Sequence, residues 1–328
     1  FLLALLCLVI GSGLFKGNIA SQVGGLYKPD DLRRADAFQL FYLGINGGVI
    51  AAPLIVGTLG EKVGWHWGFA AAGVGMLIGL CIFIAGWKYL PAEGEKTERQ
   101  PVTAQDWKSA IPLLMLIPVL AVAIVPNNQI FNAYMVWADR DFDLTFMGTR
   151  LPTTWLVTLD ATVSVAFLAI VALFWRWWSK TRREPDELQK ILIGSLFSAA
   201  GVACLFVAAA TQPAGGKIGI ALPVLFHVLN SIGFAHIMPI SLALFARLAP
   251  ASMNATIIGL YYLSLFGGNA LVGKIGTLFE TMPTTQFWLI HIACALGAGV
   301  AFLLFRLFAW PRLVARPAAA RAVAASAG

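Results

Sequence analysis

Apolar residues along this chain form long runs that are separated by short polar stretches. The runs lie near residues 1–25, 38–60, 67–89, 110–137, 151–176, 191–211, 217–246, 254–276 and 286–309. A helix needs about 20 residues to cross a hydrocarbon core about 30 Å thick, and each run has about that length. The pattern predicts nine transmembrane helices and an all-α integral membrane protein.

The composition supports this prediction. Hydrophobic residues make up 59% of the chain and charged residues 12%. Soluble domains are about 45–50% apolar and about 25% charged. The length of 328 residues therefore indicates a number of membrane spans rather than a number of soluble domains.

Basic residues gather in alternate connections between the predicted spans. Seventeen Lys and Arg residues lie in one set of connections and five in the other, and Lys16 lies inside a span. Cytoplasmic connections are enriched in Lys and Arg, so the larger set marks the cytoplasmic side. We expect a multi-pass protein of the cell inner membrane with a cytoplasmic C-terminus. The net charge of +7 reflects this orientation, so the expected partner is the lipid bilayer and not nucleic acid.

The chain shows no motif for a cofactor, a metal or catalysis. Phosphate-binding loops, His-Glu-x-x-His pairs and nucleophile elbows are absent from the sequence. The four Cys residues all lie within apolar runs without CxxC spacing, which favours buried free thiols. The sequence therefore predicts neither an enzyme nor a metal site, and no cofactor.

One charged stretch interrupts the apolar pattern. Residues 92–107 carry six charged side chains and a proline, and three predicted spans precede them while six follow. We expect residues 1–90 to be the C-terminal part of an N-terminal six-helix bundle and 91–109 a cytoplasmic linker. Residues 110–309 would form a C-terminal six-helix bundle and 310–328 a cytoplasmic tail. This division is typical of major facilitator transporters, which bind substrate between two bundles near mid-membrane.

Lys16 is the most informative residue of the sequence, because it lies within an apolar run. A Lys near the centre of a bilayer costs about 2.5–3.5 kcal/mol on insertion scales, so it is retained where a cavity, a counter-ion or an anionic ligand compensates. The alternative is that its side chain extends to the membrane interface. Lys16 points to a solute pathway.

Several motifs resemble the proton-dependent oligopeptide transporter (POT/PTR) family of the major facilitator superfamily. They are Gly13-Leu14-Phe15-Lys16-Gly17-Asn18, Phe41-Tyr42-Leu43-Gly44-Ile45-Asn46-Gly47-Gly48, Gln129 with Trp137-Ala138-Asp139-Arg140, Pro239 to Pro250, Gly259-Leu260-Tyr261-Tyr262 and Gly268-Asn269. The resemblance implies a partial major facilitator-type bundle of about nine helices that correspond to family helices 4 to 12. The family's first-helix motif, Glu-x-x-Glu-Arg-Phe, does not occur here, so we expect that earlier spans are missing from this sequence.

The resemblance also implies which residues bind substrate. Lys16 would bind the peptide carboxylate or take part in proton-linked pairing, and Asn46 would contact the peptide backbone. The alternative for Asn46 is an interhelical hydrogen bond. Tyr42, Gln129 and Tyr261 would line side-chain pockets, although packing alone also accounts for each of them.

The acidic residue of the second half differs from the family pattern. Phe234 occupies a position where family members usually carry a Glu that meets the peptide amine, and Asp160 occupies one where Asn is frequent. We expect Asp160 to supply the negative charge, either to the substrate amine or to a proton. A structural role, paired with His236 or with a hydroxyl inside the bundle, is the alternative. His236 is itself a candidate for proton coupling because His titrates near neutral pH.

The function implied by the resemblance is proton-coupled secondary transport. The chain would import di- or tripeptides or related compounds by alternating access, with small peptides and protons as partners. Three alternatives stay open: a family member with a non-peptide substrate, a non-transporting membrane sensor, and an integral-membrane enzyme.

Overall fold

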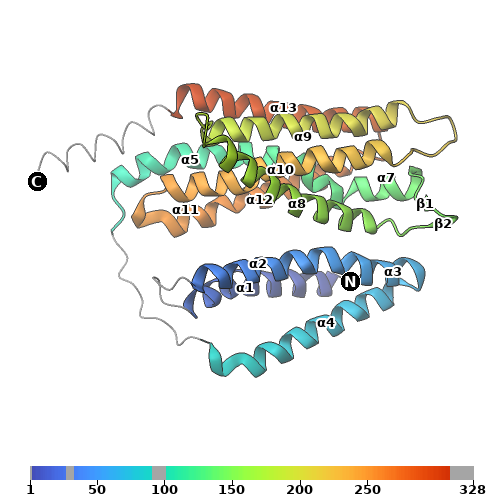
Figure 1. Cartoon of the computed structure of the whole chain (residues 1–328), viewed down its shortest axis with the longest axis horizontal. Coiled ribbons are helices and arrows are strands. Elements are labelled where there is room, and N and C mark those ends of the chain that lie inside the picture. Colours follow the sequence, from blue (N-terminus) through green and yellow to red (C-terminus); the bar gives the residue numbers. More distant parts are fainter. Residues whose placement is uncertain (1, 27–32, 91–100, 311–328) are drawn as a thin grey trace, which may run out of the picture. The chain divides into compact units, whose positions relative to one another are not determined.

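A computed structural model of the chain describes residues 2–26, 33–90 and 101–310. The chain divides into two compact units, Phe1–Glu98 and Arg99–Gly328 (Figure 1). The assignment of these units to the two bundles of a transporter stays a prediction.

The first unit consists of helices. These are α1 (Leu2–Gly25), α2 (Arg33–Ala52), the π-helical turn η1 (Pro53–Gly57), α3 (Thr58–Lys62), α4 (Trp65–Gly86) and the 3₁₀ turn η2 (Trp87–Tyr89). Helix α2 continues through η1 into α3, and the π turn lies where Pro53 removes a backbone donor. The chain then reverses at Gly64, whose φ of 149° favours glycine. Close packing of η1 and α3 on α4 follows, because a Cβ on Gly68 would lie 2.7 Å from the Val56 carbonyl oxygen and 3.2 Å from Gly60 Cα.

The second unit is a larger helical bundle. Its elements are α5 (Ala104–Ala123), α6 (Val125–Asn128), η3 (Gln129–Phe131), α7 (Ala133–Asp141), β1 (Thr145–Phe146), β2 (Thr149–Arg150), α8 (Trp155–Trp178), α9 (Glu187–Ala210), α10 (Ala221–Leu248), η4 (Ala251–Met253), α11 (Asn254–Tyr261), α12 (Leu263–Gly276) and α13 (Thr284–Phe308). Strands β1 and β2 form an antiparallel hairpin, with Thr145 opposite Arg150.

Every one of the nine predicted spans is helical in the described part of the chain. Eight helical segments there are long and apolar enough to cross a membrane. The remaining predicted span coincides with α1, a helix of 24 residues whose described apolar stretch is Leu2–Phe15. The all-α membrane fold expected from the sequence is therefore confirmed.

The structure adds two details that the hydropathy pattern did not predict. The span predicted at 110–137 is not one uninterrupted helix, because the backbone breaks between α5 and α7 and Asn132 has φ −134° and ψ −117°. Pro126, which lacks a backbone N–H, lies just before the break. The connection that follows contains the β1–β2 hairpin, whose turn residues Met147 and Gly148 both have positive φ.

Polar residues define where two helices of the second unit begin. Thr103 and Asp106 form a capping box at the start of α5, and Asp186 and Gln189 form one at the start of α9. Asp186 also accepts a hydrogen bond of 2.8 Å from Arg306 Nε on α13. Side chains thus satisfy backbone N–H groups that a helix start leaves unpaired.

Helix α9 packs between α10 and α13 in the second unit. Gly194 on α9 meets Gly233 on α10, and Gly201 on α9 lies against the backbone of Asn230 on α10. A Cβ on Gly233 would lie 2.2 Å from Ser198 Oγ. Small residues let two helix backbones approach closely, which is the usual basis of helix association in membranes.

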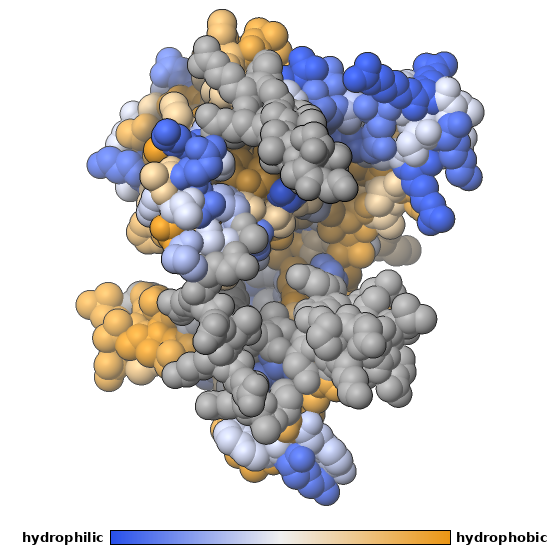
Figure 2. All heavy atoms as spheres, turned by 90° about the vertical axis from the view of Figure 1, so that its left-hand side faces the viewer, coloured by the Kyte–Doolittle hydropathy of each residue, from blue (hydrophilic) through white to orange (hydrophobic). Residues whose placement is uncertain are grey.

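Helix α13 shows how the bundle separates a protein face from an outer face. Trp288, His291 and Phe302 are at most 1% exposed, whereas Val300 and Leu304 are about half exposed. Figure 2, which views the molecule from the left-hand side of Figure 1, shows hydrophilic residues in blue and apolar residues in orange beside them. An apolar outer face of this kind is what a lipid environment requires.

Candidate functional site

A buried chain of hydrogen bonds joins three helices of the second unit. Asp160 on α8 lies 2.9 Å from His227 Nδ1 on α10, measured from its Oδ1 atom. His227 Nε2 lies 2.9 Å from the hydroxyl oxygen of Tyr134 on α7. His227 and Tyr134 are fully buried and Asp160 is 7% exposed. We call these three residues the buried triad.

The break in the helical segment of residues 104–141 sets the position of Tyr134. Tyr134 is the second residue of α7, which begins directly after the irregular residue Asn132. Its ring contacts Phe142, Phe226 and Trp288, with ring centroids 5.6, 5.5 and 6.4 Å away. The aromatic neighbours exclude water from the hydroxyl, which strengthens the electrostatic part of its hydrogen bond.

The geometry of the triad restricts where hydrogens lie. An ionised carboxylate only accepts, so His227 Nδ1 donates to Asp160 in that state. Nε2 of a neutral His227 then accepts from the Tyr134 hydroxyl. The triad carries a net charge of −1 in this arrangement. In the part of the chain that the structure describes, no Lys or Arg forms an ion pair with Asp160.

The pairing of Asp160 with His236, one of the alternatives left open by the sequence, does not occur among the described contacts, because Asp160 pairs with His227. His236 Nδ1 instead donates to the Ile232 carbonyl oxygen at 2.8 Å, and its Nε2 accepts from Trp175 Nε1 at 3.0 Å. Indole N–H only donates, so both ring nitrogens of a neutral His236 are satisfied. A proton-coupling role for His236 stays a prediction, and among the described residues its ring nitrogens pair with Ile232 and Trp175 rather than with Asp160.

The other predicted residues of the second unit have different surroundings. Tyr261 is buried, and its hydroxyl donates to the Met238 carbonyl oxygen at 3.2 Å and lies 3.0 Å from Ser241 Oγ. Phe234 is half-buried on α10, seven residues after His227 and hence near the same helix face. Gln129 is fully buried, and neither its amide nitrogen nor its oxygen has a partner in the described structure.

Sequence reasoning did not identify two residues near these positions. These residues are His227 and Asn230, neither of which was a candidate in the sequence analysis. Asn230 is fully buried one turn after His227, and both side-chain atoms lack a partner among the described residues. The signal available in the sequence was a helical spacing that places the two polar residues on one side of an otherwise apolar helix.

The predicted residues of the first unit are less fully described. The side chains of Lys16 and Tyr42 lie outside the described residues. Asn46 is half-buried on α2, and it has an interaction partner. Whether Lys16 and Asp160 face one chamber stays a prediction.

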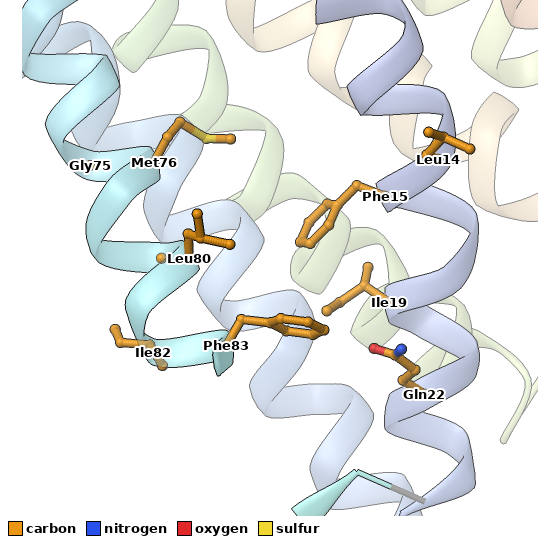
Figure 3. Close-up of a pocket in the computed structure, with 10 residues that line it drawn as sticks. Leu14, Phe15, Ile19, Gln22, Gly75, Met76, Leu80, Ile82 and Phe83 are labelled. Atoms are coloured by element: carbon orange, nitrogen blue, oxygen red, sulfur yellow. The ribbon is translucent and has the colours of Figure 1, made fainter. Parts of the chain in front are cut away.

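A cavity of about 610 Å³ lies within the first unit, between α1 and α4. Figure 3 shows Phe15 and Ile19 on α1 pointing toward Phe83 on α4 across this space. Among the lining residues whose side chains are described, Gln22 is the polar one, so this part of the wall suits apolar groups.

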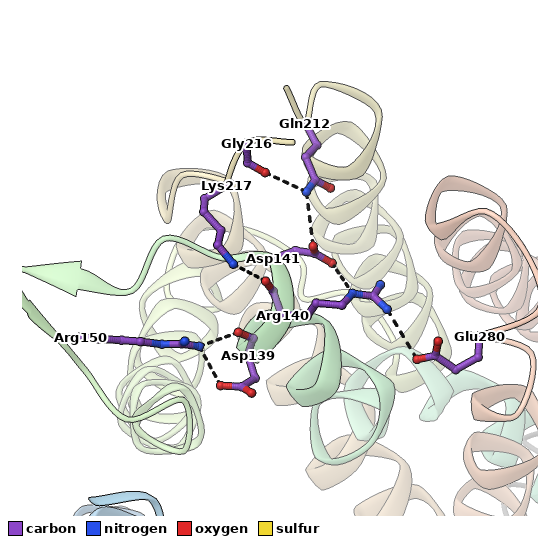
Figure 4. A network of polar contacts seen from close by, with 8 residues as sticks. All are labelled: Asp139, Arg140, Asp141, Arg150, Gln212, Gly216, Lys217 and Glu280. Carbon is purple, nitrogen blue, oxygen red and sulfur yellow. Dashed lines mark hydrogen bonds and ion pairs between the residues drawn. The ribbon is translucent and has the colours of Figure 1, made fainter. Parts of the chain in front are cut away.

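A network of polar contacts fixes the far end of α7 (Figure 4). Asp139 accepts from Arg150 of the hairpin at 2.8 Å, and Arg140 lies between Asp141 and Glu280 at 2.9 and 3.6 Å. Lys217 also donates to the Arg140 carbonyl oxygen. These contacts tie α7 to the hairpin, to the α9–α10 connection and to the α12–α13 connection. One end of α7 is held while the other borders the break.

These features define a multi-pass membrane protein with a buried acidic site next to a broken helix, an arrangement found in transporters. Comparison with known proteins supplies the family. The model of the POT family matches residues 1–102 and 93–291. The chain belongs to the POT family, a family of transporters, and the resemblance stated from the motifs is confirmed.

Relatives of known name cover most of the chain. It is 28% identical to the "Peptide transporter YePEPT" of Yersinia enterocolitica, over 93% of this chain and 74% of that protein. It is 23% identical to the "Di-/tripeptide transporter" of Lactococcus lactis, over 92% of this chain and 74% of that protein.

Solved structures show the same fold. A peptide transporter POT in complex with sulfate matches with a TM-score of 0.81 and 26% identity, over 93% of this chain and 73% of that one. A variant of a peptide transporter POT in complex with alafosfalin matches with a TM-score of 0.80 and 26% identity, over the same shares.

Proposed function

We propose that this protein is a proton-coupled symporter that imports di- or tripeptides or related compounds by alternating access. Membership of the POT family supports transport, and the names of the relatives support peptides as the substrate class. The observation that carries the proposal is a carboxylate, Asp160, held in the buried triad within a membrane-spanning unit. An intramembrane acid marks a substrate or proton pathway by default.

A peptide carries a cationic amine and a carboxylate at opposite ends, so its site needs charges of both signs. Lys16 would bind the carboxylate end, and Asn46 would contact the backbone. Asp160 would supply the negative charge, either to the amine or to a proton. Tyr42, Gln129 and Tyr261 would line the pockets for side chains.

The protein would reside in the inner membrane with its C-terminus in the cytoplasm. In the second unit, α8 and α10 end at the side where α9 begins, and Figure 1 shows the end of α13 there too. Arg247, Arg306 and Lys190 lie at these helix ends and pair with Glu187, Asp186 and Glu184. Basic residues at that side favour the cytoplasm.

Uptake by the full-length protein in liposomes tests the proposal. An inward proton gradient should drive accumulation of labelled dialanine, and unlabelled dialanine trapped inside should drive counterflow without a gradient. Lys16→Ala should abolish accumulation, while Lys274→Ala, which changes an exposed Lys on α12, should transport like the wild type.

Each contrary result has a definite meaning. Wild-type transport by Lys16→Ala would refute the assigned carboxylate site. Binding of dialanine without accumulation or counterflow would favour a sensor. Absence of both binding and transport would favour a family member with a non-peptide substrate, an outcome that the apolar Phe234 at the usual acidic position would explain.

A further inference from the structure

The strongest unassigned feature of the molecule is the continuity of the buried triad. Asp160, His227 and Tyr134 come from three different helices, and each of the two contacts measures 2.9 Å. His227 uses both ring nitrogens within the triad. A histidine with one side on a carboxylate and the other on a hydroxyl is placed to hold or pass a proton.

The charge of the triad is unbalanced in its described surroundings. Helix α9 packs apolar residues such as Val202 and Leu205 against this region, with the thiol of Cys204 at its margin. Helix α13 contributes the imidazole of His291, whose ring lies 5.2 Å from that of Trp288. Neither Cys204 nor His291 carries a permanent positive charge, and no ion pair of Asp160 with Lys or Arg occurs among the described residues.

A buried carboxylate without a cationic partner is expensive, because burial removes its hydration. One added proton brings the triad from a net charge of −1 to zero. A substrate amine would neutralise Asp160 as well, but Asp160 is only 7% exposed and already accepts from His227, which leaves little open surface for a bulky ammonium group. Of the two roles open to Asp160, the geometry therefore favours the proton.

We propose that Asp160 and His227 form the proton-binding site of the transport cycle, and that Tyr134 links this site to the break in the helical segment of residues 104–141. The inference rests on the proposed function for its role in transport. It assigns the proton to a carboxylate–imidazole pair on α8 and α10.

The proton balance of the site is simple. In the empty state Asp160 is ionised, His227 Nδ1–H donates to it, and Nε2 accepts from the Tyr134 hydroxyl. A proton that arrives from water binds Nε2, and the resulting imidazolium remains paired with Asp160. Nε2–H now donates to the Tyr134 oxygen, so the Tyr134 hydrogen must turn to another acceptor.

The hydrogen bond between His227 and Tyr134 reverses its direction next to the irregular backbone at Asn132. Tyr134 lies two residues after Asn132, whose backbone leaves the helical region. The opposite end of α7 is fixed by the Asp139 and Arg140 contacts. Protonation of His227 therefore acts on the end of α7 that borders the break. A change in this hydrogen bond can shift that end of α7 while the other end stays fixed.

Transport by three variants tests the inference. Asp160→Asn and His227→Gln should lose gradient-driven accumulation of dialanine but retain counterflow, because counterflow needs no net proton movement. Tyr134→Phe should keep accumulation but shift its pH midpoint by about one unit or more. Matched controls are Asp143→Asn, His66→Gln and Tyr89→Phe, which change exposed residues and should behave like the wild type.

Nuclear magnetic resonance of ¹⁵N-labelled histidines in liposomes gives a second measurement that needs no peptide. On acidification from about pH 8 to about pH 5, one imidazole should become an imidazolium. That signal should be missing in His227→Gln and present in the His66→Gln control. In the Asp160→Asn variant, His227 should stay neutral over the same pH range, because the carboxylate that pairs with the imidazolium is absent.

The outcomes separate this inference from the proposed function. Wild-type protein without any dialanine transport would refute the proposed function, whereas the histidine spectra would still support or overturn the proton site. Normal accumulation by Asp160→Asn and His227→Gln would overturn the proton site and leave peptide transport standing. A His227 ring that stays neutral at acidic pH would also overturn it.

Discussion

The contact between α9 and α10 at Gly233 can be tested by a single substitution. Gly233 lies at this contact, and a Cβ at its position would lie 2.2 Å from Ser198 Oγ, 2.8 Å from the Gly194 carbonyl oxygen and 3.0 Å from Ser198 N. Two of the three neighbouring atoms belong to the backbone, which cannot rotate away as a side chain can. Gly233→Ala must therefore push the two helices apart.

The expected loss of stability is of the size found for overpacked cores. Extra methyl groups in well-packed interiors cost about 1–3 kcal/mol, and we expect Gly233→Ala to fall at the upper end because backbone atoms are involved. Ser198→Ala in the same chain should recover only part of the loss. It removes the Oγ contact but leaves the contacts with the Gly194 oxygen and Ser198 nitrogen.

Thermal unfolding in detergent, followed by tryptophan fluorescence, provides the measurement. Gly259→Ala is the matched control, since a Cβ at this helical position on α11 has nothing within 4 Å. That variant should be neutral or slightly stabilised, because Ala favours a helix over Gly by about 1 kcal/mol. Equal melting temperatures for Gly233→Ala and Gly259→Ala would refute the tight contact between α9 and α10.

Two further changes test single hydrogen-bonded groups. Asp186→Ala should destabilise the second unit by about 1–2 kcal/mol, because it removes both the cap of α9 and the partner of Arg306; thermal unfolding beside the exposed Asp143→Ala checks this, and equal melting curves would contradict it. Trp175→Phe keeps an aromatic ring but removes the donor to His236 Nε2, which should cost about 1–3 kcal/mol. An unchanged melting temperature would show that this bond contributes nothing to stability.

The sequence alone was sufficient for the membrane architecture and the family. Nine apolar runs predicted nine spans, and helices occupy all of them in the described chain. The prediction succeeded because the bilayer imposes a length and a composition on each helix independently of its neighbours. The motifs around Lys16 and Asn46 identified the POT family for a similar reason, since they are local in sequence.

The sequence also singled out Asp160, but it did not identify the partner of this residue. An acid deep in an apolar run is conspicuous without any structure. Choosing between His227 and His236 required knowing which turn of α10 lies opposite Asp160, and that depends on how far α8 and α10 are offset along their axes. The offset is set by packing between helices, so a single helix carries no record of it.

The tertiary structure alone decided the remaining features of the site. It joined Tyr134 to His227 across α7 and α10, left Gln129 and Asn230 buried without partners in the described chain, and placed the break of residues 124–132 beside the triad. Hydropathy could not reveal the break, because an interrupted span is as apolar as a continuous one. The sequence by itself determined that the chain forms membrane-spanning helices. Helix packing decided which of the few buried polar side chains contact one another.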